Sequence, residues 1–192
     1  MLRGAPHYIL RRNRRENPVA GKLFADSEAT MIYLMKQKLF SWGDDFTIKD
    51  DSGQDRFFVD GKAFTLGNQL SFRDMAGNEL AFIRQKLLSW GPTYEISKGN
   101  QLLATVTKEL LTFFKCIFTV DVPGPNDLQA QGDFLDHSYV FTRNGSQVAE
   151  VSKQWFALGD TYGVQIAQGA DDVLILACTV VIDMACHGDS KR

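Results

Sequence analysis

Apolar and polar residues alternate along most of this chain, and the alternation returns at a spacing of 24 residues. It occurs in Phe46–Ile48, in Leu70–Phe72 and in Tyr94–Ile96, each of which reads apolar, polar, apolar. Such alternation is typical of a β-strand with one buried face, because successive side chains point to opposite sides of a sheet. The pattern therefore predicts the same kind of strand three times.

A second motif precedes each of these strands at the same spacing. Phe40–Gly43 returns as Phe64–Gly67 and again as Leu88–Gly91, and residues 37–43 match residues 85–91 at six of seven positions. Self-similarity at a short fixed period indicates one supersecondary unit that is used several times. The repeat predicts architecture far better than it predicts activity.

Turn chemistry follows each alternating segment. The turns are Asp50–Gly53, Asp74–Gly77 and the slightly shifted Lys98–Asn100. Glycine tolerates a positive φ, and Asp or Asn side chains bond to nearby backbone, so these are hairpin turns. Each repeat therefore predicts strand, turn and strand, with the last glycine of the preceding motif marking the next reversal.

A fourth copy lies beyond a loop-like insertion at Pro123–Asp127. Arg143–Ser146 contains an Asn-Gly pair, which is a strong hairpin signal. Val148–Tyr162 then follows the apolar pattern of Leu80–Tyr94. The segments between turns number about a dozen, as expected for an all-β barrel or sandwich.

One segment breaks the alternation. Val173–Cys186 is apolar-dominated over 14 residues; Asp171–Asp172 offers an amino-terminal cap and His187–Gly188 a stop. A membrane-spanning helix needs about 20 residues. A helix that is apolar all round belongs inside a protein, so we expect it in the lumen of a closed sheet. A buried strand is the rival interpretation, because Val and Ile are abundant here.

Two segments carry a family resemblance. Met31–Phe46 resembles the start of a LURP-one-related protein of the small bacterial type. Tyr162–Ile166, together with the helix that ends in Val181–Met184, is similar to the carboxyl end of phospholipid scramblases. Both families belong to the Tubby C-terminal-like superfamily. The resemblance implies an all-β fold with one helix: a closed antiparallel barrel of about twelve strands around a central hydrophobic C-terminal helix.

The resemblance sets the expected domain boundaries. It covers residues 31–188, with the helix at about 171–187 and a short tail at 189–192. Residues 1–30 are arginine-rich in part, and we expect a flexible basic extension or an upstream start that precedes a natural start at Met31. Two alternatives are an edge strand around His7–Leu10 and a basic arm that touches anionic lipid or nucleic acid.

Composition narrows the classes of partner and compartment. The net charge of −2 and the pI of about 5.9 provide no overall basic footprint for nucleic acid. The three cysteines lie in apolar contexts, which favours reduced thiols in a core. With no signal peptide or transmembrane span in evidence, we expect a cytoplasmic protein that can associate peripherally with a membrane.

Asp183 is the most unusual residue of the apolar segment. A buried carboxylate is costly unless it is paired, and the helix dipole near a carboxyl terminus adds to that cost. We expect it to reach the barrel rim and pair with Lys, Arg or backbone N–H groups. A proton or ligand site is the alternative.

Four cations recur at equivalent positions of the repeat, namely Lys36, Lys38, Arg84 and Lys86. They are the candidates for binding lipid head groups. Solvated charges that suppress edge pairing between strands are the more common explanation of such residues.

Other chemistry-bearing residues are sparse. Trp42, Trp90 and Trp155 are expected to be core or rim aromatics. The histidines are scattered along the chain, and no nucleophile, zincin, P-loop or C-x-x-C motif occurs. Asp160 is the only carboxylate in the stretch where scramblases have a proposed calcium loop, so we expect neither metal nor cofactor.

The resemblance then implies a function that the residues alone do not reveal. We expect a non-enzymatic barrel that binds phospholipid or phosphoinositide head groups at a membrane surface. The alternative is a protein-interaction or regulatory scaffold without a small ligand. Scramblase-like lipid movement is disfavoured, because the chain shows no spanning segment, no Pro-rich arm and no acylation cluster. A fold does not determine function.

Overall fold

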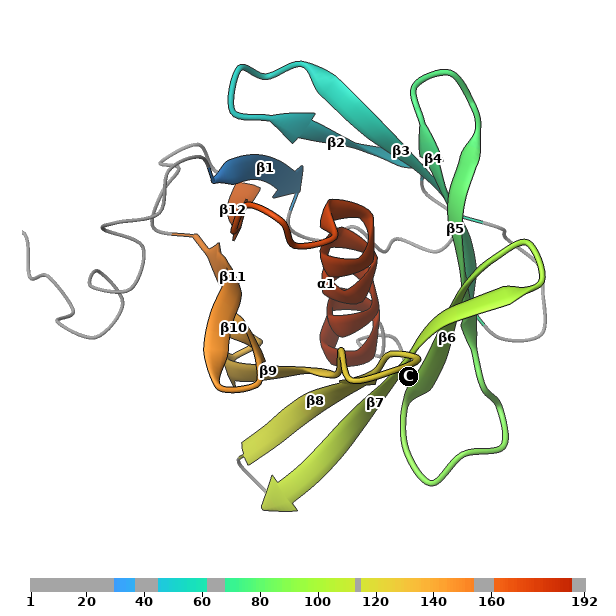
Figure 1. Ribbon diagram of the computed structural model, residues 1–192, viewed down its shortest axis with the longest axis vertical. Coiled ribbons are helices and arrows are strands. Elements are labelled where there is room, and N and C mark those ends of the chain that lie inside the picture. The colour runs from blue at the N-terminus through green and yellow to red at the C-terminus, as the bar shows by residue number, and fades with distance from the viewer. Residues whose placement is uncertain (1–29, 37–44, 62–67, 113–114, 154–160, 188–192) are drawn as a thin grey trace, which may run out of the picture.

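The strands of this protein close into a single antiparallel barrel. The computed structural model describes residues 30–36, 45–61, 68–112, 115–153 and 161–187, with the backbone alone for 110–112 and 115–116. Figure 1 shows the barrel with its one helix. The twelve strands of these residues are β1 (Met31–Lys36), β2 (Phe46–Asp50), β3 (Asp55–Gly61), β4 (Gln69–Asp74), β5 (Glu79–Gln85), β6 (Thr93–Lys98), β7 (Gln101–Thr112), β8 (Lys115–Asp121), β9 (Leu128–Asp133), β10 (Ser138–Arg143), β11 (Ser146–Ser152) and β12 (Thr161–Ile166).

The topology is an up-and-down meander. Each strand pairs with its neighbours in sequence, and β1 pairs with β12 to close the ring. All of the pairings are antiparallel, so the odd-numbered strands all finish at one end of the barrel. We call this the odd-strand end, and the opposite one the even-strand end. Closure removes the free edges that would otherwise invite aggregation.

The 24-residue repeat is a repeat of buried positions. Phe46, Leu70 and Tyr94 open β2, β4 and β6 or stand next to their first residue, and all three are buried. The residue two positions further on in each strand is completely inaccessible to solvent. The fourth copy matches as well, because Ala81 of β5 and Ala149 of β11 are both fully buried. The alternation therefore predicted the inward face correctly.

The predicted turns adopt the conformations that their residues favour. Asp50 and Asp74 occupy the same place in two successive hairpins, and each carboxylate accepts hydrogen bonds from the amides two and four residues later, at 2.8–3.0 Å. In the β10–β11 hairpin, Asn144 and Gly145 both have positive φ, +50° and +79°. That pair of angles is the signature of a type I′ turn, whose twist matches that of the flanking strands.

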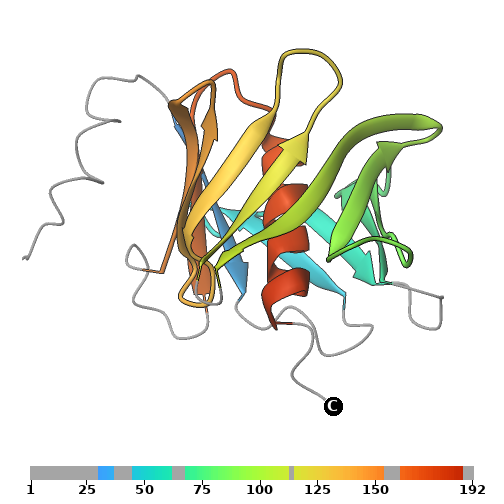
Figure 2. The same cartoon turned by 90° about the horizontal axis from the view of Figure 1, so that it is seen from below.

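Helix α1 (Asp172–His187) runs inside the ring of strands, as Figures 1 and 2 show from two directions. Every residue from Leu174 to Met184 is buried. An α-helix satisfies its backbone hydrogen bonds internally, so it can fill an apolar lumen without leaving unpaired polar groups. The helix therefore supplies the core that the inward faces of the strands require.

Both ends of α1 are tied to the barrel. At its start, Asp171 Oδ1 accepts the amide of Leu174 at 3.0 Å, and the Tyr33 hydroxyl of β1 donates to Asp172 at 2.7 Å. At its end, Lys108 Nζ of β7 donates to the carbonyl of Ala185 at 3.2 Å. Acidic groups at the amino end and a cation at the carboxyl end both complement the helix dipole.

These observations confirm the barrel around a C-terminal helix. The sandwich alternative is wrong, because β1 and β12 pair. The rival interpretation of Val173–Cys186 as a strand is also wrong, because α1 spans it. The proposed extension 1–30, apart from Thr30, and the tail 189–192 lie outside the described residues. Within the described ranges, no helix has the length and apolarity needed to cross a membrane.

Gly132 lies near the end of β9, where the backbone of β10 comes very close to it. A substitution at this position tests that close approach. The φ of Gly132 is +145°, and an added Cβ would collide with the carbonyl oxygen of Ser138 and lie 2.6 Å from Tyr139 Cα. We expect Gly132→Ala to lower the free energy of unfolding by about 2–4 kcal/mol, through backbone strain and overpacking. Gly145→Ala is the matched control: its φ is also positive, but nothing lies within 4 Å of the added atom. It should cost about 1–2 kcal/mol. Urea denaturation measures both, and equal losses would contradict the steric argument.

Candidate functional site

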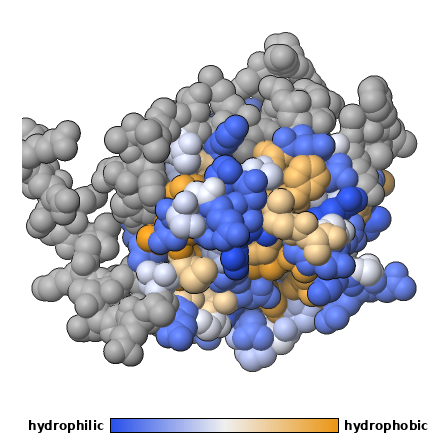
Figure 3. Space-filling view, turned by 90° about the horizontal axis from the view of Figure 1, so that it is seen from above, coloured by the Kyte–Doolittle hydropathy of each residue, from blue (hydrophilic) through white to orange (hydrophobic). Residues whose placement is uncertain are grey.

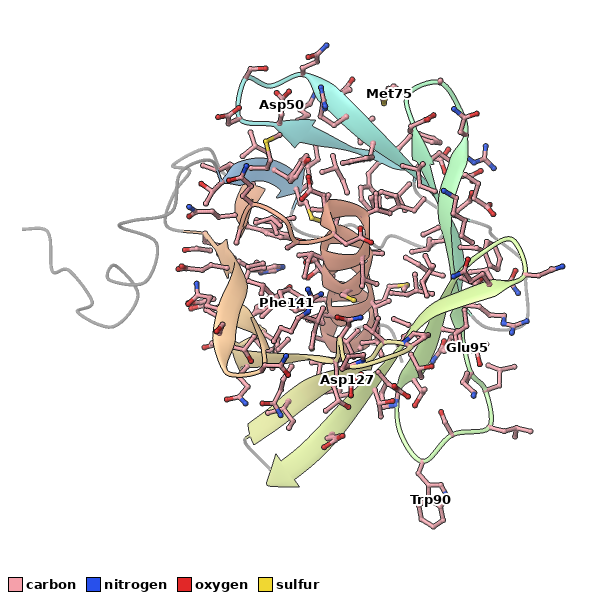
Figure 4. All side chains as sticks on the ribbon, in the orientation of Figure 1. Asp50, Met75, Trp90, Glu95, Asp127 and Phe141 are labelled. Atoms are coloured by element: carbon pink, nitrogen blue, oxygen red, sulfur yellow. The ribbon has the colours of Figure 1, made fainter. Side chains whose placement is uncertain are left out.

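An exposed apolar loop follows β5 at the odd-strand end. Leu88 and Trp90 are fully exposed, and Leu87 is 61% exposed. Figure 4 shows Trp90 pointing away from the barrel. Seven large apolar side chains are exposed in the described part of the chain, and these are three of them. Of the two expected positions for Trp90, the core is therefore wrong, because the side chain stands exposed on a loop at the rim of the barrel.

Two of the predicted cations stand at the base of this loop. Arg84 Nη2 lies 2.8 Å and Lys86 Nζ 3.2 Å from the carboxylate of Glu95 on β6. Hydrogen bonds from Arg84 and then Lys86 hold the pKa of Glu95 below its usual value. Glu95 is therefore ionised at neutral pH, and the three side chains together carry one net positive charge. Both cations remain about half exposed.

The other two predicted cations stand elsewhere. Lys36 is exposed at the end of β1, and Lys38 lies outside the described residues. Strands β2, β3 and β4 separate β1 from β5 in the barrel. Lys36 therefore shares the odd-strand end with Lys86 but not one continuous stripe. Whether any of the four binds lipid stays a prediction.

The remaining surface features of the described residues are weaker candidates for a binding site. Figure 3 shows a face on which apolar patches stand between hydrophilic side chains. An open hollow of about 330 Å³ is lined by residues of β8, β9 and β10 and of the turns beside them, including Thr119, Asp127 and Asn144. Trp42 and Trp155 lie outside the described residues.

A buried polar cluster occupies the carboxyl end of α1. Asp183 is 2% exposed, and its Oδ2 accepts a hydrogen bond from the Tyr162 hydroxyl of β12 at 2.5 Å. Its Oδ1 lies 3.3 Å from Nε2 of His137, which is 4% exposed in the loop between β9 and β10. Asp183 thus has a phenol that donates a hydrogen bond to it and an imidazole beside its other oxygen. The Lys, Arg or backbone partners expected from the sequence were wrong.

His187 completes the cluster from the last turn of the helix. Its ring stacks on that of His137, with centroids 4.8 Å apart and planes within 2°. Its Nε2 lies 3.3 Å from the carbonyl oxygen of Phe134. These two histidines look unrelated in the sequence, because 50 residues separate them and no periodicity relates a loop to a helix end. The spacing of Asp183 and His187 by four was the one available signal, since it predicts a shared helix face.

The cluster changes the acidity of the phenols around it. Burial, and secondarily the charge of Asp183, raise the pKa of Tyr162 and of Tyr139 well above the usual value. An unfolded tyrosine ionises near pH 10. These phenols therefore contribute stability that is complete below about pH 10 and is lost as the pH rises above it.

The cysteines fit the expectation of core thiols where they are described. Cys178 is buried and free, and burial raises the pKa of its thiol. Cys186 is partly buried, and its Sγ lies 3.8 Å from Lys108 Nζ. A raised pKa keeps the Cys178 thiol protonated and therefore unreactive. The side chain of Cys116 lies outside the described residues.

In comparisons with known proteins, residues 31–183 match the family model described as LURP-one-related. The chain is 39% identical over 158 residues to a Bacillus subtilis (strain 168) protein named "Uncharacterized protein YxjI", covering 82% of this chain and 95% of that protein. It is 26% identical over 170 residues to "Protein LURP-one-related 14" of Arabidopsis thaliana, covering 80% of this chain and 83% of that protein.

A solved structure is similar in fold. It is the X-ray structure of a protein from Arabidopsis thaliana, which superimposes with a TM-score of 0.62 at 18% sequence identity. The superposition covers 82% of this chain and 91% of that one. At this identity the likeness concerns the arrangement of strands and helix, and carries no activity with it.

Tyr162→Phe tests the buried hydrogen bond to Asp183. It leaves the carboxylate buried with one partner fewer, so we expect a loss of about 1.5–3 kcal/mol in the free energy of unfolding. Tyr33→Phe is the matched control, because it removes a phenol–carboxylate bond that is only partly buried, and should cost about 0.5–1.5 kcal/mol. The Tyr162→Phe variant should also lose less stability than the native protein between about pH 9 and 11. Equal losses at pH 7, or an unchanged alkaline slope, would contradict the assignment.

Proposed function

Since this chain belongs to the LURP-one-related family and exposes an apolar loop beside two cations, we propose that it binds the head groups of anionic phospholipids at a membrane surface. The odd-strand end faces the bilayer, and Leu87, Leu88 and Trp90 enter the interface. The barrel acts without catalysis, as a peripheral protein of the cytoplasmic face. Phosphoinositides belong to the same ligand class.

The exposure of the loop is the observation that carries this proposal. Moving an exposed apolar side chain from water into an apolar environment is favourable. The transfer contributes about 1.5–3 kcal/mol for a leucine that becomes fully buried. Tryptophan is enriched at the level of lipid head groups, because its ring is apolar and its N–H is polar. The loop thus supplies both residue types that a membrane interface accommodates.

Charge supports the proposal more weakly. Arg84 and Lys86 share Glu95, so only one positive charge is left over in this group. A cation near an anionic membrane contributes about 1 kcal/mol and is screened by salt. Lys36 at the same end of the barrel adds to the attraction without touching the loop.

The filled lumen restricts what kind of lipid binding is available. The helix residues from Leu174 to Met184 are buried among the inward faces of the strands. A barrel of this size holds a small ligand only when its interior is not occupied by side chains. The proposal is therefore contact with head groups at the surface, and not storage of an acyl chain.

Removing the apolar side chains should weaken binding to vesicles. We expect the double variant Leu88→Ser and Trp90→Ser to bind anionic vesicles at least about tenfold more weakly in co-sedimentation, because it forfeits most of the apolar transfer. The matched control changes Met75 and Leu102, which are exposed near the even-strand end, to serine. Equal weakening by both pairs would refute insertion through this loop. If the native protein bound no vesicle, a protein-interaction scaffold would be the better function.

Charge reversal distinguishes the cations from one another. We expect Lys86→Glu to weaken binding at low salt by about fivefold or more, because each cation contributes about 1 kcal/mol. Lys36→Glu should weaken it less if contact is centred on the loop. Lys98→Glu, at the turn between β6 and β7, is the control and should have little effect. A quadruple charge-reversal variant at Lys36, Lys38, Arg84 and Lys86 tests the whole set. Binding that survives it unchanged would exclude head-group recognition by these residues.

Soluble competitors then identify the ligand's source. Vesicles of phosphatidylcholine with phosphatidylserine, or with a phosphoinositide, separate general charge from a specific head group. An excess of soluble inositol phosphate should compete only if the head group alone is recognised. Persistent binding in its presence would assign the affinity to the bilayer.

A further inference from the structure

We propose that His137, Asp183 and His187 form a binding site for a divalent transition-metal ion of the zinc class. The three side chains offer two imidazole nitrogens and one carboxylate oxygen, all within 4.8 Å of one another. Borderline ions such as Zn²⁺ favour this mixture of nitrogen and oxygen ligands, whereas Ca²⁺ and Mg²⁺ favour oxygen alone. The proposal is independent of lipid binding.

The distance between the two most buried ligands fits such an ion. Ligands at about 2.0–2.2 Å from a tetrahedral Zn²⁺ stand about 3.4 Å apart. His137 Nε2 and Asp183 Oδ1 are separated by 3.3 Å. A hydrogen bond between these atoms would bring them to about 2.7–2.9 Å. The observed spacing is close to the one that two ligands of a single tetrahedral ion adopt.

The same groups lack hydrogen-bond partners. Asp183 Oδ1 and His137 Nδ1 are buried, and neither makes a hydrogen bond within the part of the chain that the structure describes. A buried polar atom without a partner costs about 1–3 kcal/mol. A cation at Oδ1 would remove that cost for the carboxylate and would neutralise its charge inside the apolar barrel.

An outer hydrogen bond orients Asp183, and a carbonyl oxygen lies beside His187. Tyr162 donates to Oδ2 of Asp183 and leaves Oδ1 available. His187 Nε2 faces the carbonyl oxygen of Phe134 at 3.3 Å. When Nε2 carries the proton and donates it there, Nδ1 keeps a free lone pair for the ion. Metal-ligating histidines and carboxylates almost always have partners of this kind.

The backbone brings the three ligands close together, and one side chain has to rotate before all three can bind the same ion. Asp183 and His187 are four residues apart in α1 and lie on the same helix face. His137, with φ of +48°, faces them from the β9–β10 loop. The rings of His137 and His187 are parallel, and an ion lies in the plane of each ring that binds it. His187, which is only partly buried, must therefore turn out of the stack when the ion binds.

The test is a titration of the full chain with Co²⁺ at pH 7.5, followed by Zn²⁺. We expect one equivalent of Co²⁺ to bind, with the visible absorption of a four- or five-coordinate ion, and Zn²⁺ to displace it. His187→Phe keeps a ring that can stack on His137 but removes a ligand, so affinity should fall at least tenfold while the urea midpoint changes little. His187→Cys, which restores a ligand, should recover most of the affinity.

Two further variants complete the design. His7→Ala removes the only other histidine of the chain and should leave binding unchanged. Asp183→Asn should weaken binding at least tenfold. The proposal is overturned if the native protein binds no Co²⁺ or Zn²⁺, if His187→Phe and Asp183→Asn bind as tightly as the native protein, or if His7→Ala abolishes binding. Vesicle binding is measured separately, so either proposal can fail without the other.

Discussion

The enclosure of one apolar helix is the constraint on which the rest of this structure depends. Helix α1 buries every residue from Leu174 to Met184, and no single sheet face could cover it on all sides. Only a closed ring of strands does so, which explains why β1 must meet β12. In turn, the ring needs the helix, because the inward side chains of twelve strands cannot fill a lumen of this width alone. Each element supplies the apolar surface that the other must bury.

Polar groups in this barrel therefore concentrate where the helix ends. Along α1 the side chains meet the inward faces of strands, and at its last two turns they also meet the β9–β10 loop, which lies outside the repeat. Asp183 can be buried there because Tyr162 donates to it and His137 stands beside it. Lys108 and His187 place basic groups near the negative end of the helix dipole. The cluster is thus a consequence of ending a buried helix close to water.

Much of the fold could be predicted because its signals are local. Alternation identified the buried positions of β2, β4 and β6, and the Asn144–Gly145 pair identified its hairpin from two residues. The partners of Asp183 could not be predicted in this way. His137 lies 46 residues before it, in a turn without periodicity, and only the barrel's closure brings the two together. The exposure of Trp90 could not be predicted for a related reason: a repeat shows that positions are equivalent, but not whether a loop folds inward or outward.

Both candidate sites lie at the odd-strand end, and the topology explains why. On a strand, the pleat of the backbone fixes the direction of each side chain. A substitution at an outward-facing position therefore alters the surface without moving the backbone. At the even-strand end, the β2–β3 and β4–β5 turns are held by hydrogen bonds to the carboxylates of Asp50 and Asp74, and the β10–β11 turn has the Asn144–Gly145 pair. At the odd-strand end, the seven-residue connection 86–92 between β5 and β6 exposes Leu88 and Trp90, and the short connection 134–137 between β9 and β10 brings His137 to the helix. Loops at the end of a barrel accept such side chains without disturbing the sheet, which is why both candidate sites are found there and not on the strands.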